Sequence, residues 1–278
     1  MTAIQPFHGF GLGLRRPHYS DFIESEIAVD FVEVISENFM IDGGKPLVVL
    51  DAVRAKYPVA LHGVSLSVGS AHGVDEAYLA RLRQLADRVD PLWVSDHLCW
   101  TRTSAHNSHD LLPMPYTGEA LDMVCANIQR AQDALARPML FENPSSYCSF
   151  PGNEMEEWDF LGAMCERTGC FLLLDINNIY VSAHNHGFDA RDYLRGLPLD
   201  RVRQVHLAGH TPGEILIDTH DRAVCDGVWR LYADAIALLG DVATMIERDD
   251  AIPPLDELLD ELDQAHALAT RARGRAAA

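Results

Sequence analysis

Imidazole and carboxylate side chains follow short apolar runs at six places along the chain. The residues in these positions are His62, His97, Glu142, Asp175, His206 and Glu247. A single histidine or aspartate at the end of such a run is most often a hydrogen-bonded structural group. Six ionisable groups that converge would be costly to bury unless they are paired or coordinated. We therefore predict that they converge on a metal cluster.

The types of donor narrow the choice of metal. The six residues supply three imidazoles and three carboxylates, and IDTHD adds Asp218 and His220, which can face one way from an extended loop. Mixed histidine and carboxylate sites suit non-haem iron, manganese or zinc, whereas thiolate-rich sites favour zinc or iron–sulfur clusters. Eight donors exceed what one ion takes. We predict two or three ions, bridged by carboxylates such as Glu142 or Asp175.

These donors need strands to position them. Short, near-continuous apolar runs are typical of strands buried on both faces of a parallel sheet. The segments between them have helical spacing, as in AYLARLRQLADRV. About eight strand–helix alternations predict an α/β fold, a TIM (β/α)8 barrel, whose active sites lie at the carboxyl ends of the strands. The eight runs are FHGFGLGL, FVEVISENF, PVALHGVSLS, LWVSDHLCW, MLFENPSSY, FLLLDINNIYV, VRQVHLAGH and VATMIERDD.

The chain shows no linker, internal repeat or change of composition that would mark a domain boundary. We expect a single TIM-barrel domain over residues 1–278, with a C-terminal helix at about 254–270 and a disordered tail at 271–278. A chain of this length can bury one sizeable core.

Two polar, histidine-bearing insertions interrupt the alternation. They are TRTSAHNSHDLLPMPYT, Thr101–Thr117, and SAHNHGFDARDY after the sixth strand. We expect both to be loops at the carboxyl ends of the strands. The first could supply supporting contacts or a lid through His106, Asn107, Ser108, His109 and Asp110.

Charge and cysteine usage bear on partners and compartment. A formal net charge of −19, with 41 acidic and 22 basic side chains, argues against nucleic acid and anionic membranes as partners. The N-terminal residues MTAIQPFHGFGLGLRRPH contain no apolar targeting segment, and no later run could span a bilayer. Six cysteines without a CxxC pair predict reduced thiols. We expect a cytoplasmic protein.

Several motifs resemble one enzyme family. They are HGVSLS, SDHLCW, HNSHDLLPMPYT, ENPSSY, DINNIYVSAHNHGFD, HLAGH and IDTH, in this order between about Gly9 and Leu258. Together they resemble the multinuclear non-haem iron-dependent oxidative enzymes. The resemblance implies a TIM barrel similar to xylose isomerase and endonuclease IV.

The resemblance also implies an activity. Members of this family hold two or three irons, Fe(II) or Fe(III), and use dioxygen to modify cysteines of a ribosomally made precursor peptide. The products are often oxazolone/thioamide or thiooxazole-type groups that bind copper. A separately encoded partner protein usually recruits the peptide.

Carried over residue by residue, the resemblance implies a ligand set. It comprises His62, His97, Glu142, Asp175, His206, Asp218, His220 and Glu247. Some members have a histidine three residues after the ligand aspartate, where this chain has Asn178. This difference predicts that a third iron is absent or weakly bound, because an amide is a poorer ligand than an imidazole.

Other polar residues near the ligands are candidates for supporting roles. We expect Asn143, Asn178, His210 and Asp249 to hydrogen-bond or orient ligands, and Tyr147 and Glu37 are further candidates. Arg15 and Arg16 are expected to form surface ion pairs or to contact an acidic peptide. Cys99 and Trp100 are expected to pack in the core or at the barrel rim.

Two other functions are compatible with these residues. One is a metal-dependent sugar isomerase or an endonuclease IV-like hydrolase on the same barrel. The net charge disfavours the nuclease, and the only lysines, Lys45 and Lys56, precede the ligand strands. The other is a non-catalytic metal store, which would require a coordinatively closed cluster.

Overall fold

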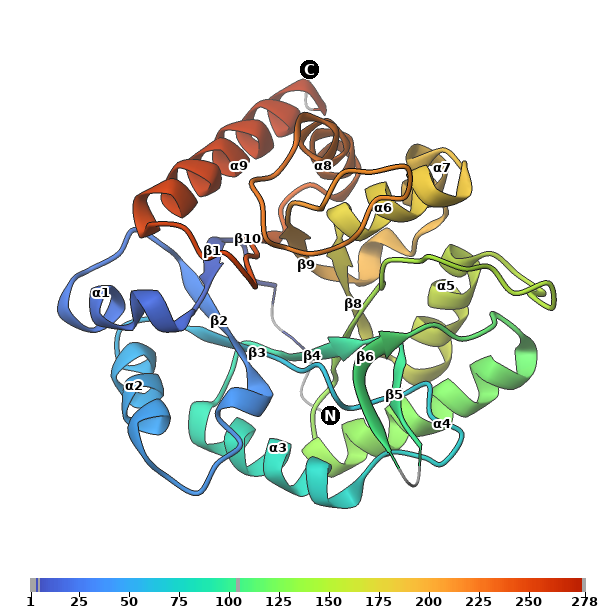
Figure 1. Ribbon diagram of the computed structural model, residues 1–278, viewed down its shortest axis with the longest axis horizontal. Coiled ribbons are helices and arrows are strands. Elements are labelled where there is room, and N and C mark those ends of the chain that lie inside the picture. The colour runs from blue at the N-terminus through green and yellow to red at the C-terminus, as the bar shows by residue number, and fades with distance from the viewer. Residues whose placement is uncertain (1–3, 5, 104–105, 277–278) are drawn as a thin grey trace. The chain divides into compact units, whose positions relative to one another are not determined.

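The computed structural model describes residues 4, 6–103 and 106–276. Eight parallel strands form a closed barrel in the order β1-β10-β9-β8-β7-β4-β3-β2, which confirms the predicted TIM barrel (Figure 1). The barrel strands are β1 (Phe10–Gly13), β2 (Phe31–Ile35), β3 (Val59–His62), β4 (Val94–His97), β7 (Leu140–Glu142), β8 (Phe171–Asp175), β9 (Val202–Leu207) and β10 (Ala243–Ile246). The eight apolar runs of the sequence correspond to these eight strands.

Helices follow the strands along the chain. They are α1 (Tyr19–Glu24), α2 (Lys45–Arg54), α3 (Glu76–Val89), α4 (Gly118–Leu135), α5 (Glu157–Thr168), α6 (Ile176–His186), α7 (Ala190–Gly196), α8 (Asp226–Leu239) and α9 (Leu255–Ala276). Short 3-10 turns lie at η1 (Arg16–His18), η2 (Ser36–Asn38) and η3 (Leu199–Arg201). The helices bury their apolar faces, as Leu79, Leu82 and Leu85 of α3 do.

The chain divides into two compact units. The first unit contains Val34–Pro144 and Cys148–Leu172, and the second contains Pro6–Glu33, Ser145–Tyr147 and the chain from Leu173 onward. In the first unit α4 packs against α3 and α5, and in the second α8 packs against α6, α7 and α9 (Figure 1). The expectation of one domain over residues 1–278 stays a prediction.

The start of helix α6 places one ligand of the predicted cluster. Asp175 is both the last residue of β8 and the N-cap of α6, because its Oδ1 accepts a hydrogen bond of 2.6 Å from the backbone N–H of Asn178. The carboxylate is therefore held at the strand end by the start of the next helix. Thr117 and Asp75 cap α4 and α3 in the same way.

The two insertions are more regular than expected. The first contains an antiparallel hairpin, β5 (Trp100–Arg102) with β6 (Asn107–Leu112), in which Trp100 pairs with Leu112. Residues 104 and 105 of this insertion lie outside the described residues. The second insertion was expected to be a loop but is helical, formed by the end of α6 and by α7. Its buried positions, Val181, Ser182 and Ala183, then Tyr193 and Leu194, are the helical signal that its polar residues obscured.

The C-terminal helix also differs from expectation. Helix α9 runs through Ala276, so residues 271–276 are helical rather than a disordered tail. Alanine and arginine favour helix. In addition, Ala272 is buried and Arg273 forms an ion pair with Asp241. These contacts extend the helix beyond the predicted boundary at 270.

Candidate metal centre

Three predicted ligands of the first unit converge. His62, His97 and Glu142 end β3, β4 and β7, and one donor atom of each lies within 4.8 Å of the other two. Glu142 Oε2 is 3.3 Å from His62 Nε2 and 3.4 Å from His97 Nε2. All three side chains are buried. The register places His97 opposite Glu142 on paired parallel strands.

The other ring nitrogen of each histidine fixes its tautomer. His97 Nδ1 lies 3.1 Å from the backbone carbonyl of Gly63, which can only accept, so Nδ1 carries the proton. His62 Nδ1 lies 2.8 Å from Ser95 Oγ, and Ser95 donates in turn to the carbonyl of Leu61 at 3.3 Å. Both Nε2 atoms therefore direct a lone pair at Glu142. This is the arrangement by which proteins orient histidine ligands.

Two acidic side chains, the half-buried Glu37 and the buried Asp96, support the loop behind these histidines. Glu37 Oε1 accepts from Tyr78 Oη at 2.7 Å and from the backbone N–H of Val64 at 2.9 Å. Asp96 Oδ2 accepts from the backbone N–H of Leu66, and burial together with Glu37 raises the pKa of Asp96 well above its ordinary value. Both carboxyl groups thus hold the segment that carries the Gly63 carbonyl. Glu37 has a structural role here, which the sequence left undecided.

Asp175, His206 and Glu247 converge in the second unit. One donor atom of each lies within 4.8 Å of the other two, and all are buried. His206 Nδ1 is 2.9 Å from Glu247 Oε2, and its Nε2 is 3.1 Å from Glu33 Oε1. Glu33 is held by a hydrogen bond of 2.7 Å from Gln204 Nε2. The imidazole of His206 therefore lies between two buried carboxylates.

His220 joins the same unit from the loop after β9. Its Nε2 lies 2.7 Å from Asp218 Oδ1 and 3.9 Å from Asp175 Oδ2, and its Nδ1 lies 3.2 Å from Asp249 Oδ2. The backbone of His220 is in the left-handed region, with φ of 47°, which is uncommon for a residue other than glycine. Strain of this kind is tolerated where the surroundings fix the residue. The loop thus presents the ring to a group of carboxylates.

Arg15 supplies a buried positive charge to this group. Its guanidinium forms an ion pair with Asp249, lies 3.5 Å from Glu247 Oε1 and donates through Nε to the carbonyl of Arg248 at 2.8 Å. The Arg15 side chain is only 10% exposed. The expectation of a surface pair was therefore wrong for Arg15, whereas Arg16 is exposed.

The electrostatics of the second unit require cations among its carboxylates. Burial works against a charged His206, but Glu33 and Glu247 outweigh it and raise the pKa of His206 well above its ordinary value. Burial likewise opposes a charged His220, and Asp218 is the main cause that raises its pKa. Burial raises the pKa of Asp175 to about 7, against the opposing effect of His220. Without metal, protonated imidazoles neutralise these carboxylates.

The residues present fit metal ions. In both units, imidazole nitrogens face carboxylate oxygens at short distances. The lone pairs of the two atoms would repel each other unless a proton or a metal ion lay between them. His62, His97 and Glu142 form a set of two histidines and one carboxylate, the ligand set of many non-haem iron sites. The second unit is richer in carboxylates and suits a hard cation or a second iron.

The remaining predicted residues take different places. Asn143 and Asn178 are buried beside Glu142 and Asp175. His210 does not join the groups of converging donors: its Nδ1 lies 2.7 Å from Asn177 Oδ1, and the amide of Asn177 donates to Asp218 Oδ1 at 2.7 Å. Asn177 therefore links His210 to Asp218 by hydrogen bonds.

Some further residues were predicted only in part or not at all. Tyr147 is 46% exposed and accepts a hydrogen bond from the backbone N–H of Asp218. Cys99 is buried, as expected, whereas Trp100 is part of the hairpin. Sequence reasoning missed Glu33 and Ser95. The charged residue within the apolar run FVEVI was a usable signal for Glu33, whereas nothing in the sequence distinguishes Ser95.

A comparison with models of protein families now identifies the relationship. Residues 9–270 match the family described as RiPP precursor modification enzyme MbnB/TglH/ChrH. The chain belongs to this family. The abbreviation RiPP denotes ribosomally synthesised and post-translationally modified peptides. Members of the RiPP precursor modification family thus act on precursor peptides, and the family inferred from the motifs is confirmed.

Relatives within the family are similar over nearly the whole chain. A UPF0276 protein of Rhizorhabdus wittichii is 68% identical over 271 residues, which cover 96% of this chain and 97% of the relative. The name UPF0276 gives no reaction.

Solved structures with the same fold are sugar epimerases and related barrels. D-psicose 3-epimerase, solved in the presence of D-fructose, aligns with a TM-score of 0.61 at 11% identity over 96% of this chain and 99% of that chain. A xylose isomerase domain protein from Planctomyces limnophilus aligns with a TM-score of 0.58 at 14% identity over 98% and 99%. At such identities the likeness shows the fold alone. It confirms the expected similarity to xylose isomerase.

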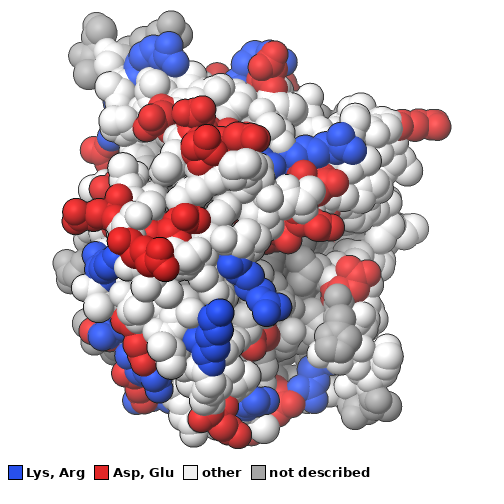
Figure 2. Space-filling model, turned by 60° about the vertical axis from the view of Figure 1, so that its left-hand side comes forward, with Lys and Arg blue, Asp and Glu red and all other residues white. Residues whose placement is uncertain are grey.

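Two further features concern the charge of the surface and the hydrophobicity of the helices. On the face shown in Figure 2, acidic and basic side chains are interspersed. Among the described residues, none of the helices is both long enough and apolar enough to cross a membrane.

Proposed function

We propose that this chain is a multinuclear iron enzyme that uses dioxygen to modify cysteine residues of a ribosomally made precursor peptide. The observation that carries the proposal is the set of His62, His97 and Glu142, whose two Nε2 atoms face one carboxylate oxygen. Two histidines and one carboxylate leave coordination positions open, as oxygen-activating iron sites do. Family membership supplies the class of substrate.

The ligands of the proposed centre are those expected from the sequence. His62, His97 and Glu142 hold one ion in the first unit, and Asp175, His206, Asp218, His220 and Glu247 provide for one or two ions in the second. Asn178 stands where some family members have a histidine, and it weakens the binding of a third ion. Bound iron would supply positions for a substrate thiolate and for dioxygen and would accept the electrons removed from the cysteine.

The protein's own residues orient and protect this centre. Gly63 and Ser95 fix the tautomers of His97 and His62, so that both rings meet iron as neutral donors. Glu33 accepts from His206 Nε2, which leaves Nδ1 of His206 for the metal. Asp249 and Arg15 orient His220 through its Nδ1. Burial of these groups keeps water away from reactive species.

Further features of the proposal follow from the family. The modified cysteines form oxazolone/thioamide or thiooxazole-type groups suited to copper, a separately encoded protein recruits the peptide, and the reaction takes place in the cytoplasm. A metal-dependent sugar isomerase or hydrolase is a weaker alternative, because the likeness to sugar epimerases rests on 11% identity. A non-catalytic metal store is weaker still, since it does not explain the relationship to peptide-modifying enzymes.

The test is an oxygen-dependent change in peptide mass. Iron-loaded protein is mixed with a cysteine-containing precursor peptide, with and without its neighbour-encoded partner protein, and oxygen uptake and peptide mass are followed. We expect the cysteine to be modified only with iron and dioxygen, and faster with the partner. Sugar isomerisation with Mg(II) or Zn(II) and no oxygen uptake would instead support the alternative.

A further inference from the structure

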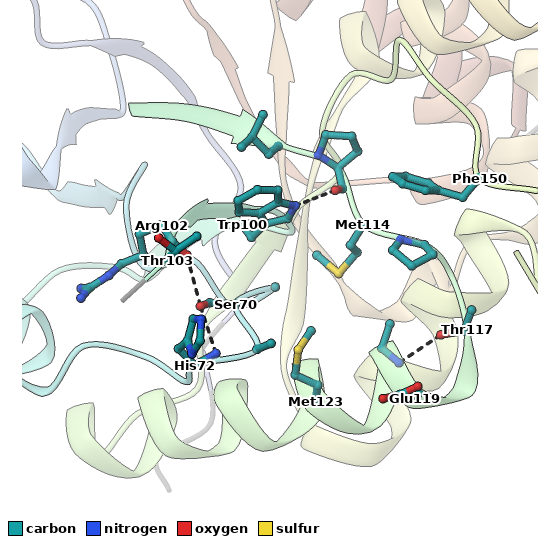
Figure 3. Close-up of a pocket in the computed structure, with 16 residues that line it drawn as sticks. Ser70, His72, Trp100, Arg102, Thr103, Met114, Thr117, Glu119, Met123 and Phe150 are labelled. Atoms are coloured by element: carbon teal, nitrogen blue, oxygen red, sulfur yellow. Dashed lines mark hydrogen bonds between the residues drawn. The ribbon is translucent and has the colours of Figure 1, made fainter. Parts of the chain in front are cut away.

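A cavity of about 750 Å³ lies among loops of the first unit. It is lined by the loops that follow β3, β4 and β7, including Gly69, Trp100 and Phe150, and by the start of α4 (Figure 3). These are the strands that end at His62, His97 and Glu142. Loops after parallel strands gather at the same edge of a barrel as the active site. The cavity is therefore built from the same strand-end loops that surround the proposed iron site.

The lining of the cavity is mostly apolar, although Ser70, Thr117 and Glu119 also contribute to it (Figure 3). Trp100, Met114, Met123 and Phe150 surround the hollow in Figure 3. The N–H of the Trp100 indole is already hydrogen-bonded, because Nε1 donates to the carbonyl of Pro113 at 2.8 Å. The two methionines provide flexible thioethers that adapt to differently shaped apolar groups. The cavity is thus suited to a bulky apolar side chain.

Short backbone links connect the cavity to the ligands. The N–H of Gly69 donates to the carbonyl of Cys99 at 2.9 Å, and the N–H of Leu98 donates to the carbonyl of Glu142 at 2.9 Å. Trp100 follows His97 by three residues, so their Cα atoms are at most about 11 Å apart. An extended peptide covers this distance in about three residues.

The rim of the cavity favours a peptide over a free fatty acid. His72, Arg102 and Thr103 lie at one end and make it polar, which suits the backbone of a peptide (Figure 3). Arg102 forms an ion pair with Asp75, so a ligand carboxylate would gain little from it. A volume of about 750 Å³ exceeds the needs of one side chain and leaves room for the adjoining backbone.

We propose that this cavity binds a bulky apolar side chain of the precursor peptide that lies within about three residues of the cysteine to be modified. The inference rests on the proposed function, because it assumes that the cysteine reaches the iron site of the first unit. It adds a specificity determinant: the residue type near the cysteine decides which peptides, or which cysteines of one peptide, are modified.

The test uses seven-residue peptides of fixed design. The parent is acetyl-Gly-Gly-Gly-Cys-Gly-Gly-Gly-amide, and phenylalanine replaces each glycine in turn. Affinity for the iron-loaded protein is measured by anaerobic titration calorimetry, and oxidation is then measured in air. We expect phenylalanine at one position to raise affinity at least tenfold and at the other positions to have little effect.

Two variants localise the effect. Met123→Glu places a charge inside the cavity and should remove the gain from phenylalanine, whereas Ala126→Glu, on the exposed side of the same helix, should retain it. Phe150→Ser, in a loop, replaces Met123→Glu if the helix variant does not fold. Iron content is measured on every sample, so that loss of peptide binding is separated from loss of metal.

The outcomes distinguish this inference from the proposed function. If phenylalanine has no effect at any position, or if its gain survives both Met123→Glu and Phe150→Ser, the cavity does not bind the peptide. If the wild-type protein binds the phenylalanine peptides as predicted but oxidises none of them, nor a full precursor with its partner, the proposed reaction is wrong while the cavity assignment stands.

Discussion

Glu142→Ala is expected to lower the rate of cysteine modification by more than about 100-fold. Mutation of a residue that only hydrogen-bonds a metal ligand typically lowers activity by about 10- to 100-fold, and loss of a ligand itself should exceed this. Glu142 provides the only carboxylate among the three converging donors of the first unit, and its Oε2 faces both His62 and His97. Without it, two neutral imidazoles must hold a cation alone. The variant should therefore also lose iron, measured per chain by elemental mass spectrometry.

Glu166→Ala is the matched control for this prediction. Glu166 lies on the exposed face of α5 in the same unit, and its removal should leave both iron content and rate unchanged. If Glu142→Ala retained its iron and its activity, Glu142 would be no more than a structural group, and the assignment of the first site would be wrong.

Arg15→Ala is expected to lower the stability of the protein by about 3 kcal/mol, because it removes the buried cation that pairs with Glu247 and Asp249. Breaking a buried ion pair usually costs about 3–5 kcal/mol. We expect the lower end of this range because Asp249 is 40% exposed, whereas Arg15 and Glu247 are 10% and 5% exposed. For a chain of this size, the loss corresponds to a melting temperature lower by about 5 °C. Calorimetry of the iron-loaded protein measures it.

Arg16→Ala provides the comparison within the same dipeptide. Arg16 is exposed, so its removal should change stability by less than about 0.5 kcal/mol. Equal melting temperatures for the two variants would show that the Arg15 charge does not balance Glu247 and Asp249. A lower iron content in Arg15→Ala alone would further support the positioning of His220 through Asp249.

The sequence was sufficient for the barrel and for the ligand candidates for a physical reason. In a parallel barrel, a side chain at the carboxyl end of a strand immediately follows an apolar run. Its position in the site can therefore be predicted from the neighbouring residues in the sequence. His62, His97 and Glu142 are the last residues of their strands, as the runs predicted. Their convergence follows from the register of the barrel.

The parts that could not be predicted depend on contacts far apart in the chain. Arg15 and Arg16 are alike in sequence, and only the fold shows that Arg15 reaches Asp249, 234 residues away. Ser95 acts through a hydrogen bond to His62, and Gly63 through a backbone carbonyl that leaves no mark in the residue type. The helices of the second insertion were hidden because polar residues fill their exposed faces.

The measurement that tests this account most directly is the metal content per chain, determined by elemental mass spectrometry. The protein is produced in iron-replete cells and purified without chelators. We expect two irons per chain, or three if the weakened site with Asn178 is also filled. Zinc, magnesium or manganese without iron, or a metal content near zero, would contradict it.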